Sequence, residues 1–343
     1  MGIEQSKDEI VQIGRIFLSD ENKNIVIVTH DRADGDGLGS MLAMGNALSA
    51  HDKNVTCVIF DELAPRYAFL SDDKLLRVLG KDISVDELFA ADTFVILDTA
   101  VEEQLEPINE FLMRFKGKII IIDHHSHYEL QLAPEIVWQD KSVAATGILI
   151  SQLLDGLDWL KGAKIAEYLL IAIGSDTGWF RYNNTDAECF KLAERFVRLG
   201  ANSHCLYEKL FLSDSPERFK LLARALNSSE FYANNRLITL TLRRLDFQQT
   251  GASQSDTENI IDEACRVNSL EIAALFVEQE DLKTRISLRS RSAFDVNRFA
   301  KQFGGGGHPK AAGIKLKCSL SEAKEKIITA LTTILSEHKQ GGI

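Results

Sequence analysis

The 343-residue sequence has no apolar run close to the roughly 18 residues that a membrane-spanning helix requires. We therefore expect no membrane segment, and the polar, acidic start MGIEQSKDEI predicts no secretory signal. Cysteine is scarce too: the five residues are odd in number, widely spaced and include no C-x-x-C pair. This usage excludes a disulfide scaffold and predicts a reduced, cytoplasmic protein.

Positive charge is in short supply as well. The net charge is −11, and residues 1–210 carry 20 Lys and Arg against 34 Asp and Glu, whereas residues 211–343 carry 19 against 16. Proteins that hold long nucleic acid usually present a basic surface, so a processive nuclease on long DNA is not expected. The acidic half suits cations, and the mildly basic half suits phosphate groups.

The length predicts about two domains at roughly 150 residues each. The first half alternates Val- and Ile-rich runs with helix-like stretches, which predicts an α/β domain over residues 1–210 with a parallel sheet. The predicted strands are residues 25–30, 55–60, 93–98 and 118–123, and the predicted helices include 39–50, 105–115, 163–174 and 185–199.

The pattern changes in the second half. We predict a helical connector at residues 211–230, centred on a helix at 215–228, and a smaller α/β domain over 231–343. Its predicted strands are residues 237–242, 271–277, 284–291 and 314–317, with helices at 295–302 and 319–338.

Metal-binding residue types follow three predicted strands of the first domain, at the point where each strand ends. His30 ends the first strand, Asp98 ends the third, and Asp123-His124-His125 ends the fourth. Ligands of open parallel sheets bind beyond the carboxyl ends of the strands, so we expect these side chains to lie together.

A glycine-rich turn after the first strand carries two further acids, Asp34 and Asp36. Its glycines, Gly35, Gly37 and Gly39, give G-x-G-x-G rather than the dinucleotide fingerprint G-x-G-x-x-G, and the two carboxylates would repel a pyrophosphate. The turn therefore predicts a metal-binding loop; the alternative is an Asp that caps the following helix.

Asp176 adds a carboxylate just past the end of an apolar helix. Histidine combined with several carboxylates suits Mn²⁺, and suits Mg²⁺ or Zn²⁺ less well. The number of ligands exceeds the need of one catalytic ion, and it predicts two ions about 3.5–4 Å apart that share a carboxylate. Such centres activate water and hold the oxygens around a phosphorus atom.

Two features of the second domain point to anions. The glycines of residues 304–308 (GGGGH) can expose consecutive backbone N–H groups that bind an anion, or form a flexible linker. In the predicted strand 284–291, Arg285, Arg289 and Arg291 share one face, which is either a phosphate contact or an ordinary solvent-exposed face.

Together these motifs resemble the DHH phosphoesterase superfamily with its DHH-associated C-terminal domain. The matching segments are His30-x-x-x-Asp34-x-Asp36, Asp98, Asp123-His124-His125, Asp176-Thr177-Gly178, Ser287-Leu288-Arg289-Ser290 and Gly304-Gly305-Gly306-Gly307-His308. Ala33 and Gly37 depart from residues common in the family without removing a ligand, and Trp179 replaces a smaller residue and could stack on a base.

The resemblance implies a role for each matching residue. His30 and Asp34 would hold one Mn²⁺, Asp36, His124 and Asp176 the other, and Asp98 would bridge them, with Mg²⁺ as the alternative metal. His125 would touch the scissile phosphate, and Asp123 would orient a histidine. The predicted substrate contacts are Arg289, Gly305, Gly306, Gly307, His308 and Arg181. The active site would then lie in the cleft between the two domains.

Within the superfamily, the compact two-domain length resembles the NrnA-type nanoRNase and phosphoadenosine-phosphate phosphatase group. This implies hydrolysis of short RNA or DNA oligonucleotides to nucleoside monophosphates, or of 3′-phosphoadenosine 5′-phosphate to AMP and phosphate. The alternatives are a phosphodiesterase for linear or cyclic dinucleotide signals, a RecJ-like single-strand exonuclease, and a nucleotide-binding regulator without activity. Family members are often dimers, so a homodimer is an expected assembly.

Overall fold

The computed structural model describes residues 2–125 and 128–337. The chain divides into two compact units, residues 1–213 and residues 214–343. Each unit has its own sheet and its own apolar clusters, and each is described by itself below.

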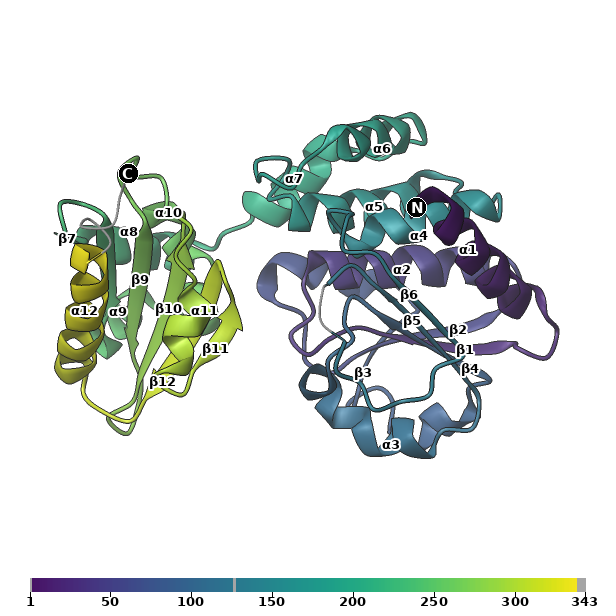
Figure 1. Cartoon of the computed structure of the whole chain (residues 1–343), viewed down its shortest axis with the longest axis horizontal. Helices are drawn as coiled ribbons and strands as arrows, with labels where there is room; N and C mark the ends of the chain where they lie inside the picture. Colours follow the sequence, from purple (N-terminus) through teal and green to yellow (C-terminus); the bar gives the residue numbers. More distant parts are fainter. Residues whose placement is uncertain (1, 126–127, 338–343) are drawn as a thin grey trace. The chain divides into compact units, whose positions relative to one another are not determined.

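The described part of the first unit contains six strands and a set of helices (Figure 1). The strands are β1 (Asn24–Val28), β2 (Asn54–Ile59), β3 (Leu76–Val78), β4 (Thr93–Leu97), β5 (Lys118–Asp123) and β6 (Ile136–Gln139). The α-helices are α1 (Gly2–Leu18), α2 (Gly35–Ser49), α3 (Asn109–Arg114), α4 (Thr146–Gly156), α5 (Ala163–Asp176), α6 (Ala187–Arg198) and α7 (Ser203–Phe211). Three 3₁₀ helices join them: η1 (Pro65–Asp72), η2 (Asp86–Ala90) and η3 (Glu102–Ile108).

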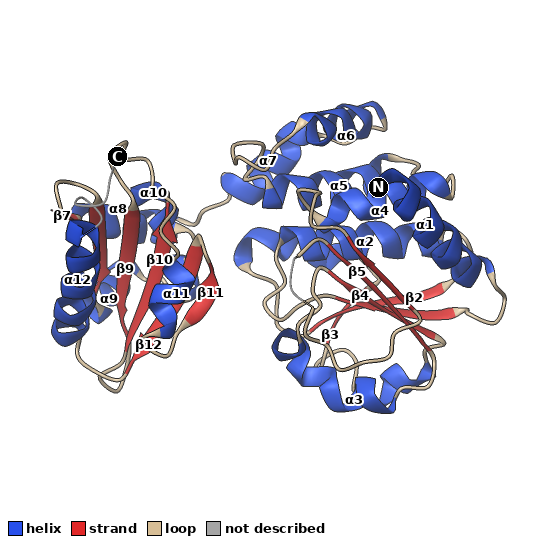
Figure 2. Ribbon diagram, viewed as in Figure 1, coloured by secondary structure: helices blue, strands red, loops and turns tan. Residues whose placement is uncertain are grey.

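The first sheet is parallel throughout, with the strand order β3-β2-β1-β4-β5-β6. Helices α1, α2, α4 and α5 cover one face, and η3 and α3 cover the other (Figures 1 and 2). Both faces are buried, which explains why the strands are continuous apolar runs. The chain leaves β1 toward β2 on one side and returns to β4 on the other, so the switch point of the sheet lies between β1 and β4.

The α/β prediction for this unit is confirmed, and the four predicted strands are β1, β2, β4 and β5. The short strands β3 and β6 and the helix α1 were not predicted. The helix predicted at residues 105–115 is divided into η3 and α3. Pro107 lies near the division, and its ring nitrogen donates no hydrogen bond to a continuous α-helix.

The second unit has a mixed sheet. Its strands are β7 (Glu230–Tyr232), β8 (Leu237–Leu242), β9 (Ile272–Glu278), β10 (Thr284–Ser290), β11 (Gly306–His308) and β12 (Ala311–Leu316). Its helices are α8 (Pro216–Asn227), α9 (Arg244–Thr250), η4 (Ser255–Thr257), α10 (Ile260–Ala264), α11 (Val296–Lys301) and α12 (Leu320–Glu337). The strand order is β11-β12-β10-β9-β8-β7, and only the β8–β9 pair among these strands is parallel.

Helices α11 and α12 pack on one face of this sheet, and α8 and α10 pack on the other. The helix that we assigned to a connector is α8, and it belongs to the second unit because Leu221 and Ala225 are buried in its apolar cluster. In β10 the residues alternate between buried and half-buried, so Arg285 and Arg289 share one face as predicted, whereas Arg291 lies beyond the end of the strand.

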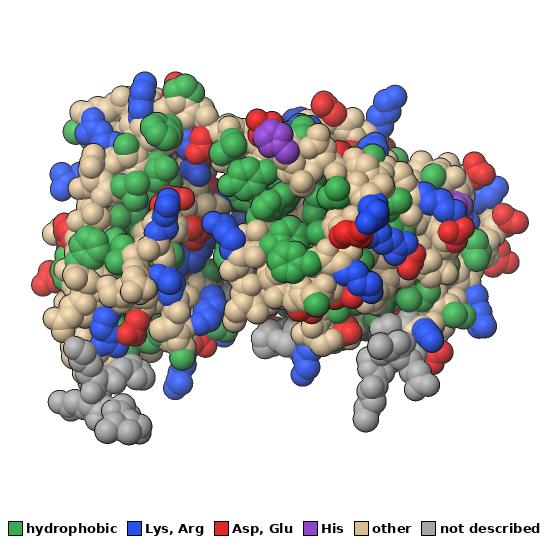
Figure 3. Space-filling model, turned by 90° about the horizontal axis from the view of Figure 1, so that it is seen from above, with side chains coloured by type: hydrophobic (Ala, Val, Ile, Leu, Met, Phe, Trp, Pro, Cys, Tyr) green, Lys and Arg blue, Asp and Glu red, His purple; other side chains and the backbone are tan. Residues whose placement is uncertain are grey.

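Surface features agree with the composition. On the face shown in Figure 3, acidic and basic side chains are interspersed, and the described residues form no continuous basic track there. Among residues 2–125 and 128–337, no helix is long and apolar enough to cross a bilayer.

Candidate metal centre

The glycine-rich turn after β1 begins helix α2. Asp34 is the N-cap, and its Oδ1 accepts hydrogen bonds from the N–H groups of Asp36 at 2.9 Å and Gly37 at 3.2 Å. A Cβ on Gly37 would lie 2.3 Å from Thr29 Oγ1, and one on Gly39 would lie 2.4 Å from the Tyr168 carbonyl oxygen. These glycines therefore let α2 pack closely against β1 and α5. The capping alternative is correct for Asp34, and the same Oδ1 also lies 3.7 Å from His30 Nε2.

The predicted ligands converge at the carboxyl edge of the sheet, from β1, α2, β4, β5 and α5. They form three groups, and within each group the ligand atoms lie within 4.8 Å of one another. The groups are His30 with Asp34 and Asp98; Asp36 with His124 and Asp176; and Asp98 with His124 and His125. Asp98 and His124 each belong to two groups, so the three groups form one continuous cluster at the switch point of the sheet.

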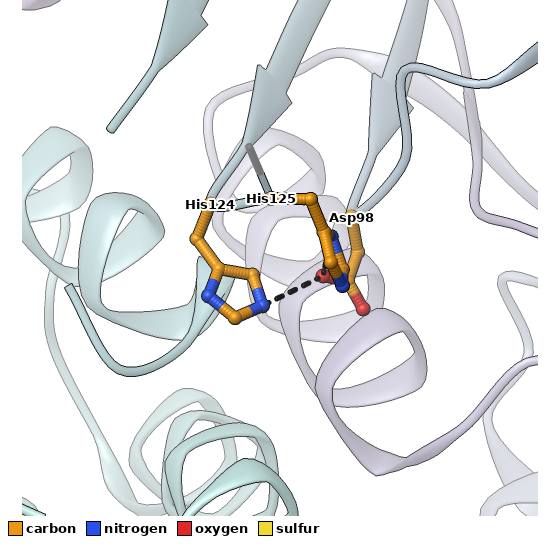
Figure 4. A group of neighbouring side chains, drawn as sticks. All are labelled: Asp98, His124 and His125. Atoms are coloured by element: carbon orange, nitrogen blue, oxygen red, sulfur yellow. Dashed lines mark ion pairs between the residues drawn. The ribbon is translucent and has the colours of Figure 1, made fainter. Parts of the chain in front are cut away.

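Asp98 occupies the centre of this cluster. Its Oδ2 lies 3.6 Å from His30 Nε2. Its Oδ1 lies 3.7 Å from His124 Nε2, and Figure 4 shows this pair. Asp98 also has a positive φ of 63°, a conformation uncommon for non-glycine residues. The two oxygens of one carboxylate therefore face histidines on opposite sides, as a bridging ligand requires.

The two histidines present Nε2 to the carboxylates. Nδ1 of His30 lies 2.8 Å from the Asp31 carbonyl oxygen, and Nδ1 of His124 lies 3.4 Å from the Val143 carbonyl oxygen. A carbonyl oxygen accepts only from a protonated Nδ1, which in a neutral imidazole leaves the Nε2 lone pair for a metal ion. The buried His124 Nε2 lies 3.1 Å from Asp176 Oδ2, but no hydrogen bond satisfies it.

His125, which belongs to the group with Asp98 and His124, is paired with Asp123. Nδ1 of His125 lies 2.8 Å from Asp123 Oδ1, and Gln139 Nε2 donates to Asp123 Oδ2 at 3.1 Å. Although burial acts to raise it, the pKa of Asp123 is lowered by its contacts with His125 and Gln139. Asp123 is completely buried and His125 is about one third exposed, so the carboxylate orients a ring that remains accessible.

Two acids of the cluster, Asp36 and Asp176, have raised pKa values. Although burial acts to raise it, the pKa of Asp34 is lowered to about 2 by contacts with His30 and with the Gly37 and Asp36 N–H groups. Burial, together with the Asp98, Asp176 and Asp34 carboxylates, raises the pKa of Asp36 well above its usual range. Burial likewise raises the pKa of Asp176 to about 6. Burial lowers the pKa of His124, but its carboxylate neighbours outweigh this effect and raise it to about 9. Protons on these side chains offset the negative charge of the clustered carboxylates, and a bound divalent cation would replace those protons.

Helix α4 contributes contacts that the sequence analysis missed. The N–H groups of Thr146 and Gly147 donate to the two oxygens of Asp36, at 2.6 and 2.9 Å. The Thr146 hydroxyl donates to Asp98 Oδ1 at 2.9 Å, and Ser40 Oγ donates to Asp36 Oδ1 at 3.1 Å. The only available signal was a small-residue stretch before an apolar helix, which does not identify a partner 110 residues away.

The donor set fits divalent metal ions. The cluster combines carboxylate oxygens with imidazole nitrogens, contains no thiolate, and leaves the buried Nε2 of His124 without a hydrogen bond. Such a set suits Mn²⁺ and related ions, whereas structural zinc sites usually contain cysteine.

The predicted substrate contacts of the second unit are already partly engaged. Arg289 Nε donates to Asp262 Oδ1 at 2.8 Å, Arg291 donates to the Val267 carbonyl oxygen at 2.6 Å, and Arg285 donates to Thr257 Oγ1.

The glycine run forms the edge of the second sheet. The N–H groups of Gly304 and Gly305 donate to carbonyl oxygens of α11, and the substrate contact expected of Gly305 stays a prediction. Gly306 and Gly307 lie in β11, whose outer side pairs with no other strand among the described residues. The His308 side chain lies outside the described part of the structure.

Two residues lie in the loop that follows α5. Arg181 is exposed, and its Nε donates to the Gly178 carbonyl oxygen at 2.7 Å. The Trp179 ring packs against Phe211 and Tyr207, with ring centroids 5.6 and 6.0 Å away. Trp179 thus packs against helix α7, and its side chain is only partly exposed.

A cluster of carboxylates and histidines at the switch point of a parallel sheet defines the class of protein, a metal-dependent hydrolase. Residues 24–173 match the N-terminal domain of the DHH family, and residues 234–337 match the DHHA1 domain. The chain therefore belongs to the DHH family of phosphoesterases, as the motifs predicted.

Curated relatives resemble the chain over most of its length. It is 29% identical over 314 residues to the bifunctional oligoribonuclease and PAP phosphatase NrnA of Thermus thermophilus, covering 90% of this chain and 89% of that protein. It is 25% identical over 326 residues to the Bacillus subtilis protein of the same description, covering 92% and 96%. A crystal structure of an exopolyphosphatase-related protein from Bacteroides fragilis shares the fold, with a TM-score of 0.86, 22% identity and coverage of 96% and 98%.

Proposed function

We propose that this protein is a two-metal phosphoesterase that hydrolyses short oligoribonucleotides to nucleoside monophosphates. We also propose that it converts 3′-phosphoadenosine 5′-phosphate to AMP and phosphate. The observation that carries the proposal is the Asp98 carboxylate, whose two oxygens face His30 and His124 on opposite sides. The activities named for the NrnA relatives supply the substrate class.

The side chains divide the work of the centre. His30 and Asp34 would hold one ion, Asp36, His124 and Asp176 the second, and Asp98 both. When bound, two such ions activate a water and stabilise the oxygens around phosphorus. His125, oriented by Asp123, would contact the scissile phosphate.

The metal proposed is Mn²⁺, with Mg²⁺ as the alternative. Mg²⁺ prefers an all-oxygen octahedral shell, whereas imidazole nitrogen is a better ligand for the later divalent ions. Two histidines aim Nε2 at the carboxylates of this centre, and this favours Mn²⁺.

The second unit is proposed to bind the rest of the substrate. Arg289, the outer backbone groups of Gly306 and Gly307, and His308 would hold a terminal nucleotide, and Arg181 would add a contact from the first unit. A substrate with few phosphates agrees with the net charge of −11, because a long strand would be repelled.

The test is a chromatographic assay with the purified full-length chain and Mn²⁺. Its substrates are a 5′-phosphorylated RNA dinucleotide, a five-residue RNA, phosphoadenosine phosphate, a cyclic dinucleotide and pyrophosphate. We expect metal-dependent AMP from the RNA and from phosphoadenosine phosphate, and no cleavage of pyrophosphate. Activity on the cyclic dinucleotide alone would replace the proposal with a signalling phosphodiesterase, and inactivity on every substrate would refute it.

The setting of the enzyme is part of the proposal. All five cysteines are unpaired, which supports a reducing, cytoplasmic compartment. A homodimer remains a prediction, and light scattering after size-exclusion chromatography would measure it.

A further inference from the structure

Helix α4 directs its N-terminus at the metal centre. The first N–H groups of a helix have no partner within the helix. In α4, two of them, from Thr146 and Gly147, donate to Asp36, one to each oxygen. A Cβ on Gly147 would lie 2.5 Å from Ala172 Cβ, so glycine is what allows this approach.

The hydroxyl of Thr146 makes a second, different contact. It donates to Asp98 Oδ1 at 2.9 Å, and this is the oxygen that faces His124, while Oδ2 faces His30. Thr146 is completely buried, so no solvent competes for this bond. A carboxylate oxygen has more than one acceptor site, so Oδ1 can accept from Thr146 and still bind a metal ion.

The contacts of Thr146 are therefore asymmetric. Its N–H holds Asp36, which belongs to the group with His124 and Asp176. Its hydroxyl holds the Asp98 oxygen on that same side. No hydrogen bond of Thr146 among the described residues reaches His30 or Asp34.

We propose that Thr146 is a positioning residue that fixes Asp98 and Asp36 and thereby strengthens the ion held by Asp36, His124 and Asp176 far more than the ion held by His30 and Asp34. The inference rests on the two-ion centre proposed above. Residues that hold a ligand in place typically contribute about 10- to 100-fold to metal affinity. We expect a loss of that size at one ion only.

The experiment titrates metal-stripped full-length protein with Mn²⁺, by calorimetry and by electron paramagnetic resonance. Wild type should bind two ions. Thr146→Val should bind one ion with near wild-type affinity and the other about 10- to 100-fold more weakly. Thr146→Ser, which keeps the hydroxyl, should restore the second affinity. Excess Mn²⁺ should recover the activity of Thr146→Val, which a merely structural defect would not allow.

A matched control lies on the strand that precedes Asp98. Thr93 is also completely buried, and its hydroxyl donates to Asn22 Oδ1 at 3.2 Å, at the start of β4. Thr93→Val removes a buried hydroxyl at the opposite end of the strand and should leave both affinities unchanged. Thr146→Ala is a second hydroxyl-free variant if the valine variant fails to fold.

The outcomes separate the two proposals. Two ions in wild type with unchanged affinities in Thr146→Val would overturn the positioning role and leave the two-ion centre intact. Equal weakening of both ions, with no recovery in Thr146→Ser, would also overturn it. A single ion in wild type would overturn the two-ion centre and this inference with it.

Discussion

The two units differ in the partners of their charged side chains, including those that are expected to bind substrate or metal. In the second unit, Arg289 pairs with Asp262 at 2.8 Å, and Lys324 pairs with Glu230 at 3.1 Å. In the first unit, Asp36, Asp98 and Asp176 converge without any lysine or arginine among the ion pairs of the cluster. Among the described residues, the ion-pair partners of these three acids are histidines. These two basic side chains of the second unit thus already have acidic partners, whereas the acids at the centre of the first unit would gain cationic partners on binding metal ions.

The largest effect should come from removing the shared ligand. Asp98→Asn replaces the one carboxylate that, among residues 2–125 and 128–337, faces both His30 and His124, so neither ion would be held correctly. Because loss of a mere supporting residue costs about 10- to 100-fold, loss of this ligand should reduce kcat/KM by at least about 1,000-fold. Single-turnover hydrolysis of a phosphorylated dinucleotide measures this, with circular dichroism to verify the fold.

An acid of the same unit that already has a cationic partner is the control for this variant. Asp155 forms an ion pair with Arg195 on the surface. Asp155→Asn should leave activity within about twofold, since exposed pairs contribute about 0–1 kcal/mol to stability and nothing to the centre. Equal activity in Asp98→Asn and Asp155→Asn would mean that an acid facing the histidines of the centre matters no more for catalysis than a surface acid paired with an arginine.

The second-largest effect is expected to be a dependence of the metal affinity on pH. The carboxylates around His124 raise its pKa to about 9, so the ring is protonated at neutral pH in the metal-free protein. Because Nε2 must lose its proton to bind an ion, the affinity for Mn²⁺ should rise with pH, by up to about tenfold per pH unit. Between pH 6 and pH 8 the release of the His124 proton alone should contribute a gain of up to about 100-fold.

Calorimetry in buffers with different ionisation enthalpies measures this proton release directly. The sign is fixed by the raised pKa: protonated His124 stabilises the metal-free fold at low pH and competes with the metal there. An affinity that stays level between pH 6 and pH 8, with no proton released, would mean that His124 is not a ligand.

The sequence was sufficient to predict which side chains come together, because most of them follow a Val- and Ile-rich strand or an apolar helix. His30, Asp98 and His124 lie at strand ends, and a parallel sheet brings such ends to one edge. These residues are far apart along the chain. The strand order is the common doubly wound one, however, so alternating strands and helices were enough to predict that the strand ends meet.

Other parts of the site left no usable trace in the sequence. The contacts of Thr146 and Gly147 with Asp36 are made by backbone N–H groups, which every residue type but proline possesses. Strand β3 has three residues and β6 has four, too few for a periodic pattern to identify them. The partner of Arg289 lies 27 residues away on α10, and only the tertiary structure reveals that pair.

The smallest effect is expected from the second unit, where Arg289 already has an acidic partner. Arg289 is proposed to bind a substrate phosphate from a half-exposed position, so Arg289→Ala should raise KM about tenfold and leave kcat within about twofold. Arg266→Ala, which breaks an exposed pair with Glu263, is the control and should change neither constant. Asp262 competes with the phosphate for the Arg289 guanidinium, so Asp262→Asn should lower KM. If Arg289→Ala has no effect on KM while Asp262→Asn raises it, this pair only stabilises the second unit, and the basic residues there do not bind the substrate.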